Sequence, residues 1–224
     1  LATEFGKRIS TLYIDPATGV IFRDTIQRIE KGNHYPLGLL HLAVSCPDFA
    51  PKLYVRKKDW ADIDEFFARF SGEMLLKPPQ VGVFGEYEEF MANMRPLMLI
   101  YSWIDEASEE RILSNLGVEP GDLHRAVENC DWLLYSLREI CYLLGRGDLI
   151  GQVEELRQRV KYGIKAELQP LTRLEGIGRV RARAIYNAGF KDLASLNNAS
   201  VKKLAAISKI GDTLAKNLKE QINR

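Results

Sequence analysis

Apolar residues recur along most of the chain at the three- and four-residue spacing of amphipathic helices. Proline at helix starts, glycine at helix ends and Asp or Ser at N-cap positions divide this pattern into separate helices. The helices expected from these signals cover residues 16–31, 36–46, 59–74, 86–106, 109–116, 120–144 and 148–163. Pro96 lies inside the fourth of these and is expected to kink it, and residues 52–57 are expected to be briefly extended. No segment is strand-rich, so the pattern predicts an all-α, multi-helix bundle.

Beyond Pro170 the helices become short and the turn signals dense, which places a domain boundary near residues 168–171. Within this last part a pattern is repeated, and its two copies are Gly178-x-x-x-Ala182-x-x-Ile185 and Gly211-x-x-x-Ala215-x-x-Leu218. Glycine permits a tight hairpin between two helices, and alanine lets the helices cross closely. The repeat therefore predicts a small domain of two helix-hairpin-helix units in residues 170–224, after a bundle in residues 15–169.

Each predicted hairpin presents the start of its second helix, where free backbone N–H groups and the positive end of the helix dipole favour phosphate. The candidate phosphate-binding residues are Gly176, Ile177 and Gly178 in the first hairpin and Lys209 and Gly211 in the second. Lys209 replaces a glycine of the first copy, so it offers a charge where the first hairpin offers a backbone cradle. A purely structural pair of hairpins, used for docking, is the alternative.

Charge is unevenly distributed along the chain, although the net charge is only +1. Residues 171–224 carry 11 Lys and Arg against 4 Asp and Glu, whereas the rest of the chain carries 20 against 26. An acidic body with a basic module indicates an anionic partner for the module. A solvated lysine-rich surface is the alternative.

The helix expected at residues 122–144 has two different faces. A broad apolar stripe is formed by Leu123, Val127, Cys130, Leu134, Leu137 and Cys141. Arg125 and Trp132 lie two turns apart and roughly opposite that stripe, and Asn129 and Ser136 share their face. One guanidinium and one indole at this spacing suit a single strand of nucleic acid, with a base stacked on Trp132 and a phosphate at Arg125. Packing of Trp132 against another helix of the bundle is the alternative.

Cysteine and histidine give no sign of metal or disulfide chemistry. The three cysteines form no C-x-x-C pair and the three histidines have no metal-ligand spacing, so we expect buried free thiols, a reducing compartment and no zinc. The longest apolar run, residues 97–104, is far too short to span a membrane. The chain opens at Leu1 in what reads as mid-domain sequence with no signal peptide, so we expect a fragment of a cytoplasmic, nucleoid-associated protein.

Three segments resemble one family, the archaeal Hel-type DNA repair helicases of the superfamily-two, Ski-like group, which are related to HELQ. LATEFGKRISTLYIDPATGVIF resembles the junction between a winged-helix domain and the helical bundle, which assigns residues 1–14 to the end of the former. PGDLHRAVENCDWL resembles the ratchet helix, and RVKYGIKAELQPLTRLEGIGRVRARAIYNAGF resembles the start of the C-terminal helix-hairpin-helix domain.

The resemblance implies that the parent is an ATP-dependent helicase that unwinds forked DNA in the 3′-to-5′ direction. This chain would be its C-terminal ratchet bundle and terminal module. Arg125 and Trp132 match the ratchet positions that contact the translocating strand, and Arg179, Arg181 and Arg183 match the arginine motif of the terminal domain. In the family that domain is thought to bind emerging single strand and to restrain the motor.

The arginine helix is expected to do two jobs on different sides. Its core side should be Gly178, Ala182, Ile185 and Gly189. Arg179 and Arg183 then fall on one flank, as candidates for phosphate. Val180 and Ala184 point outward as a strip that, with Arg181, is expected to pack on the bundle or the motor and pair with a carboxylate there.

The catalytic parts of a helicase are absent from this sequence. It contains no G-x-x-x-x-G-K-[ST] and no Asp-Glu-x-His box, so it should not hydrolyse ATP by itself. No cofactor is expected in the chain, and ATP and Mg²⁺ would belong to the parent's motor domains. We expect a monomer with no membrane partner that binds single-stranded or forked DNA and the motor domains. Two alternatives remain, the scaffolding bundle of an RNA-remodelling helicase and a helical docking protein.

Overall fold

The computed structural model describes residues 3–79 and 85–223, and these residues contain helices, turns and coil but no strand. The predicted all-α fold is therefore confirmed. The chain divides into two compact units, one of residues 1–103 with 107–161 and one of residues 104–106 with 162–224. The second unit thus begins at Tyr162, earlier in the chain than the boundary expected from the turn signals, and it includes a short segment from the middle of the chain.

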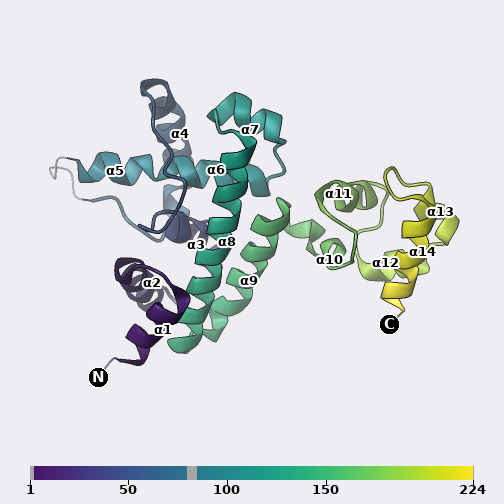
Figure 1. Cartoon of the computed structure of the whole chain (residues 1–224), viewed down its shortest axis with the longest axis horizontal. Helices are drawn as coiled ribbons and strands as arrows, with labels where there is room; N and C mark the ends of the chain where they lie inside the picture. Colours follow the sequence, from purple (N-terminus) through teal and green to yellow (C-terminus); the bar gives the residue numbers. More distant parts are fainter. Residues whose placement is uncertain (1–2, 80–84, 224) are drawn as a thin grey trace. The chain divides into compact units, whose positions relative to one another are not determined.

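The first unit contains nine α-helices among its described residues (Figure 1). They are α1 (Glu4–Leu12), α2 (Pro16–Arg28), α3 (Pro36–Val44), α4 (Trp60–Phe70), α5 (Glu86–Ala92), α6 (Met94–Ile104), α7 (Glu109–Leu116), α8 (Pro120–Leu143) and α9 (Gly147–Tyr162), with short 3₁₀ turns at Lys57–Asp59 and Ser71–Glu73. The first-unit boundary falls within the last turns of α6 and α9. The extended segment expected at residues 52–57 is coil up to Arg56.

Local signals set most of these helix boundaries as predicted. Asp15 caps α2, since its carboxylate accepts a hydrogen bond from the Ala17 N–H at 2.7 Å, and Ser108 caps α7 in the same way. Gly117 ends α7 in the left-handed conformation at φ 63°, where a side chain would be strained. The helices therefore begin close to their predicted caps, whereas α2 ends at Arg28 and α4 at Phe70, before their expected ends at residues 31 and 74.

The long helix expected over residues 86–106 is instead two helices. The chain turns at Asn93, so α5 ends at Ala92 and α6 begins at Met94. Pro96 has no N–H to donate to the carbonyl of Ala92, and its ring would clash there. Proline is tolerated in a first turn, so the break falls before Pro96 rather than at it.

Helix α8 is the central helix of the first unit, and α1, α2 and α3 pack on it. Every residue of its predicted apolar stripe is buried, as are Ala126, Leu133 and Ile140. In Figure 1 this helix runs through the middle of the unit beside α9. Its extra buried positions widen the stripe, because a helix covered on several sides buries more than one face.

The second unit is a helix-hairpin-helix tandem with its own core. It contains α10 (Gln169–Thr172), α11 (Arg179–Asn187), α12 (Leu193–Asn198), α13 (Val201–Ala205) and α14 (Gly211–Ile222), after a 3₁₀ turn at Ala166–Leu168. Both copies of the sequence repeat contribute buried residues to one cluster: Ile177, Ala182 and Ile185 from the first, and Ile210, Ala215 and Leu218 from the second. The two copies therefore share a single hydrophobic core.

The three cysteines are free and buried, as predicted. Burial raises the pKa of Cys141 to about 12, so its thiol is protonated and unreactive near neutral pH. Among the described residues no group of three His, Cys, Asp or Glu could hold a metal ion. Within the same ranges every helix is too short or too polar to cross a bilayer.

Candidate nucleic-acid interface

Arg125 lies on the outside of α8 near its start. Its side chain is 66% exposed, and its nearest ionic partner is Asp122, one turn earlier, at 3.8 Å. An exposed pair at that distance contributes little free energy. The guanidinium is therefore available to an incoming anion.

Trp132, two turns further along α8, is half-buried. Its indole Nε1–H donates a hydrogen bond of 3.3 Å to the carbonyl oxygen of Leu12, the last residue of α1. The bond fixes the orientation of the ring while part of it stays exposed. One edge of Trp132 therefore packs on a neighbouring helix, as the alternative interpretation has it, and stacking of a base on the ring stays a prediction.

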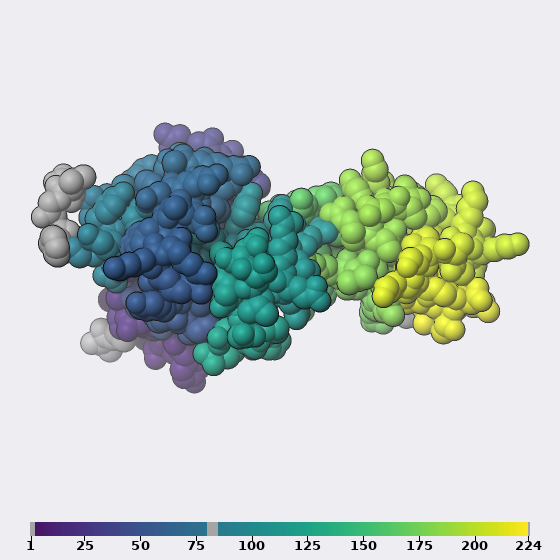
Figure 2. Space-filling model, turned by 90° about the horizontal axis from the view of Figure 1, so that it is seen from above, coloured from purple at the N-terminus to yellow at the C-terminus, as the bar shows by residue number. Residues whose placement is uncertain are grey.

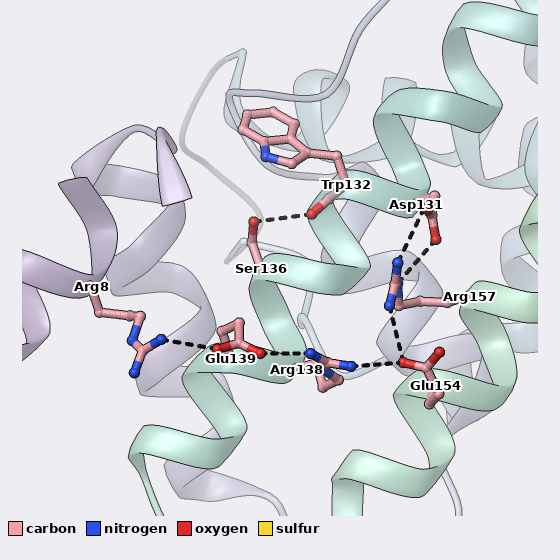
Figure 3. Close-up of polar contacts among 8 residues, drawn as sticks. All are labelled: Arg8, Asp131, Trp132, Ser136, Arg138, Glu139, Glu154 and Arg157. Atoms are coloured by element: carbon pink, nitrogen blue, oxygen red, sulfur yellow. Dashed lines mark hydrogen bonds and ion pairs between the residues drawn. The ribbon is translucent and has the colours of Figure 1, made fainter. Parts of the chain in front are cut away.

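A chain of ion pairs joins α1, α8 and α9 beside Trp132 (Figure 3). The order is Arg8, Glu139, Arg138, Glu154, Arg157 and Asp131, and neighbours lie 2.8–3.3 Å apart. Figure 3 shows the Trp132 indole pointing away from Arg157. Burial alone would raise the pKa of Glu154, but the charge and hydrogen bonds of Arg157, together with hydrogen bonds from Gln158 and Arg138, outweigh it and hold that pKa below its usual value. Such a network stiffens the helices that carry the indole.

The other two polar residues of this face are occupied inside the protein. The Asn129 side chain accepts a hydrogen bond from the Ala50 N–H at 2.8 Å and donates one to the Asp48 carbonyl at 3.2 Å. Ser136 is fully buried and donates to the carbonyl of Trp132. The Asn129 amide therefore anchors the segment that precedes Pro51, and its contact with nucleic acid stays a prediction.

The first hairpin of the second unit turns at Gly176, which has φ 79°. This left-handed conformation favours glycine, and a Cβ added there would lie 3.2 Å from the Leu214 side chain. Ile177 is buried, whereas Gly178 is exposed and extended, with open space around the position of a Cβ. The backbone before α11 is thus accessible at Gly178.

Lys209 occupies the same position in the second hairpin and also has a positive φ, 69°. It is one of three described non-glycine residues in that region, and it keeps the turn geometry at a steric cost. Gly211 follows with φ 64° at the first position of α14, whereas Gly178 does not have a positive φ. The two hairpins therefore share a positive φ at the first turn residue, Gly176 or Lys209. They differ in φ at the glycine two positions later, Gly178 or Gly211.

Arg181 links the two hairpins. Its Nη1 donates to the Gly176 carbonyl at 2.7 Å and its Nε to the Lys209 carbonyl at 3.1 Å. The guanidinium satisfies one backbone acceptor from each turn, and so acts as a brace inside the second unit. A carboxylate partner for Arg181 on the bundle or the motor domains stays a prediction.

Arg183 is the arginine that pairs with carboxylates. Its Nε and Nη2 bind the two oxygens of Glu106 at 2.8 and 2.6 Å, and Nη2 also binds Glu167 at 2.9 Å. Burial would raise the pKa of Glu106, but the hydrogen bonds from Arg183 and the Lys165 N–H outweigh it and lower that pKa. The side chain predicted for a phosphate is thus neutralised within its own unit, and binding a phosphate would require this ion pair to open.

The remaining faces of α11 differ in part from the prediction. Ala182 and Ile185 are fully buried, as expected, but Gly178 and Gly189 are exposed and do not belong to the core side. Ala184 packs against the core of the second unit rather than pointing outward. Val180 is 62% exposed, which leaves an isolated apolar side chain where an apolar strip was expected.

Sequence reasoning missed Glu106 and Glu167 as partners of the arginine helix. Glu106 lies 77 positions before Arg183, and no local pattern connects them. The presence of three arginines in one short helix could have indicated carboxylate partners, because partly buried guanidinium groups need them. Arg179 also contributes by its charge to lowering the pKa of Glu106.

Both units match known protein families. The family described as archaeal helicase, domain 4, matches residues 37–163, and the SAM-like helix-hairpin-helix tandem matches residues 168–224. The second match covers the helices that share the core described above.

Three similar curated proteins are each named ATP-dependent DNA helicase Hel308. The one from Pyrococcus horikoshii is 39% identical over all of this chain and 30% of its own length, and the one from Pyrococcus abyssi is 41% identical over 92% of this chain and 28% of its own. The one from Methanocella arvoryzae is 36% identical over all of this chain and 30% of its own length. The chain thus spans about 30% of the length of these relatives. With more than half of its residues matched, the chain belongs to the archaeal helicase domain 4 family.

Proposed function

We propose that this chain is the DNA-holding part of an ATP-dependent helicase that translocates 3′ to 5′ on single-stranded DNA and acts on forked DNA. The names of the relatives support DNA and helicase action. The first unit grips the strand during translocation, and the second binds DNA or docks on the motor domains and restrains them.

The observation that carries this proposal is the placement of Arg125 and Trp132 two turns apart on α8. Two turns of helix separate them by about 10 Å, which is a distance that a short stretch of single strand can bridge. Arg125 is exposed and weakly paired, so it can meet a phosphate without losing a strong partner. The Trp132 ring is held by Leu12, so a base can stack on it with little loss of side-chain entropy.

In the second unit the accessible backbone at Gly178 and the start of α11 form the phosphate site. The positive end of the helix dipole at the start of α11 attracts an anion there without reading its sequence. The exposed Val180 is the contact for the motor domains. Lys209 and Gly211 contribute a charge and a turn in the second hairpin.

ATP hydrolysis and its Mg²⁺ belong, in this proposal, to motor domains that the present sequence does not contain. The relatives are more than three times as long as the part that this chain matches. The role of this chain is then to hold the single strand while the motor domains move along it.

Binding of a fluorescently labelled single-stranded oligonucleotide, followed by anisotropy at several salt concentrations, tests the proposal. Trp132→Ala should weaken binding by about 1–3 kcal/mol. Arg125→Ala should weaken it too and make the salt slope less negative by about 0.7 for one lost phosphate contact. Arg28→Ala, which removes an exposed arginine of α2, is the matched control and should leave the affinity unchanged.

Circular dichroism separates loss of binding from loss of structure, because Trp132→Ala also removes the contact with Leu12. Trp132→Phe keeps a stacking ring without the N–H donor and should retain most of the affinity. Unchanged affinity in both Arg125→Ala and Trp132→Ala would overturn the proposal for the first unit.

A further inference from the structure

The coil between α3 and α4 carries two exposed side chains on one side. Lys52 and Tyr54 are exposed, whereas Leu53 and Val55 are partly buried. Alternation of this kind follows from extended backbone, in which every second side chain points the same way. Tyr54 is 83% exposed, one of the most exposed large apolar side chains in the described chain.

This segment lies beside the Arg125 face of α8. Lys52, Tyr54 and Asp122 line one hollow of about 210 Å³, and Asp122 is the residue that faces Arg125. Upstream, Asn129 of α8 holds the Ala50 N–H. In Figure 2 the blue surface around residues 50–60 borders the teal surface of the turn between α7 and α8. The coil therefore follows α8 from its third turn towards its start.

The downstream end of the segment is held by two ion pairs to the buried Asp59. Asp59 accepts hydrogen bonds from the Arg56 N–H at 2.8 Å and the Arg56 side chain at 3.0 and 3.1 Å, and Arg95 lies 2.7 Å away. Arg95 also donates to the Leu116 carbonyl at the end of α7. Tyr54 is thus presented on a backbone fixed at both ends rather than on a loose loop.

The charges around Tyr54 favour a polyanion. Lys52, Lys57 and Lys58 are exposed in or next to the segment. Arg56 adds a fourth cation, already paired with Asp59, and Asp122 is the one carboxylate among the residues that line the hollow. An exposed ring between cations matches the stacking platforms that bind single-stranded nucleic acid, whereas a protein-docking patch would have further apolar neighbours.

We propose that Lys52 and Tyr54 form a second binding wall for the strand held by α8. A base stacks on the Tyr54 ring, and Lys52 and Arg125 neutralise the phosphates on either side of it. The inference rests on the proposed function, because it places its new contacts on the same single strand. It extends that site beyond α8 to a coil that the sequence marked only as extended.

The experiment compares tyrosine variants of the whole chain in the same oligonucleotide-binding assay. Tyr54→Ala should weaken binding about fivefold or more with little change of the salt slope, because stacking releases no counterion. Tyr54→Trp should restore or exceed the original affinity. Lys52→Gln should make the salt slope less negative by about 0.7. Tyr142→Ala removes a tyrosine that is 71% exposed at the far end of α8 and should have no effect.

The outcomes separate this inference from the proposed function. If Arg125→Ala weakens binding while Tyr54→Ala and Lys52→Gln do not, the strand is held by α8 alone. The inference of a second binding wall is then wrong. If Arg125→Ala and Trp132→Ala have no effect but Tyr54→Ala does, the coil binds DNA by itself and the α8 proposal fails. A loss in Tyr54→Ala that Tyr54→Trp does not restore also contradicts stacking.

Discussion

Arg183 and Glu106 form a two-pronged ion pair, with Nε–Oε2 and Nη2–Oε1 distances of 2.8 and 2.6 Å. The pair fastens α11 to the segment of residues 104–106, which belongs to the second compact unit. Its side chains are 27% and 14% exposed, so solvent screens the attraction only in part. Planar, bidentate geometry makes it stronger than a surface pair.

Breaking this pair should loosen the second unit without unfolding the first. A double-mutant cycle with Arg183→Met and Glu106→Gln should give a coupling energy of about 1 kcal/mol. Amide hydrogen exchange resolves the effect by region, and exchange in α11 should accelerate most. Arg173→Met, at an exposed arginine of the same unit, should change stability by less than about 0.5 kcal/mol. Equal acceleration in α8 would contradict a local role.

The same carboxylates predict a pH dependence of stability. The folded-state pKa of Glu106 is lowered from 4.5, and so is that of Glu167: for each, burial acts in the raising direction but the contacts with Arg183 outweigh it. Their contribution is therefore complete above about pH 4.5 and is lost as the pH falls through the lower folded values. Thermal unfolding between about pH 6 and pH 3 should show this loss. In Arg183→Met the loss of stability at low pH should be smaller. If this variant has the same pH dependence of stability as the original chain, the assignment to Glu106 and Glu167 is wrong.

Lys209 separates turn geometry from charge in the second hairpin. Its φ of 69° disfavours branched side chains, so Lys209→Val should destabilise the chain by about 1 kcal/mol or more. Lys209→Gly should be neutral or slightly stabilising, because glycine adopts this conformation without strain. Urea unfolding measures both. If Lys209 also meets phosphate, Lys209→Gly should reduce the salt slope of DNA binding while the fold is retained.

Asp122 should oppose DNA binding. Its carboxylate faces Arg125 and lines the hollow beside Tyr54, where it would lie close to a bound phosphate. Asp122→Asn should strengthen binding about two- to threefold at low salt, with the gain fading as salt is added. The change also removes an acid from the first turn of α8 at a cost of about 0.3–1 kcal/mol of stability. Weaker binding in a folded variant would contradict the proposed path of the strand.

The sequence predicted the architecture well where neighbours along one helix decide the outcome. The apolar stripe of α8 is buried as predicted, because helical periodicity places those residues together whatever packs on them. Caps at Asp15 and Ser108 act within a few residues of the helix start. The repeat in the second unit was equally local, and both copies lie in one core.

Side-chain partners were predicted poorly, since distant segments supply them. Trp132 finds its acceptor 120 positions earlier in Leu12, and Asn129 binds a coil 79 positions earlier. Arg181 and Arg183 differ by two positions on one helix, yet one braces backbone carbonyls and the other binds carboxylates. Helical periodicity separates their directions but does not reveal what lies in each direction.

The brace at Arg181 ties the two hairpins of the second unit to each other. One guanidinium holds the first turn residue of both hairpins, and both copies bury their apolar residues in one core, so we expect neither copy to fold by itself. A peptide containing either hairpin alone would expose half of a shared interior and lose the donor, or the second acceptor, of the brace. We therefore expect that the two hairpins can be expressed and redesigned only as a pair.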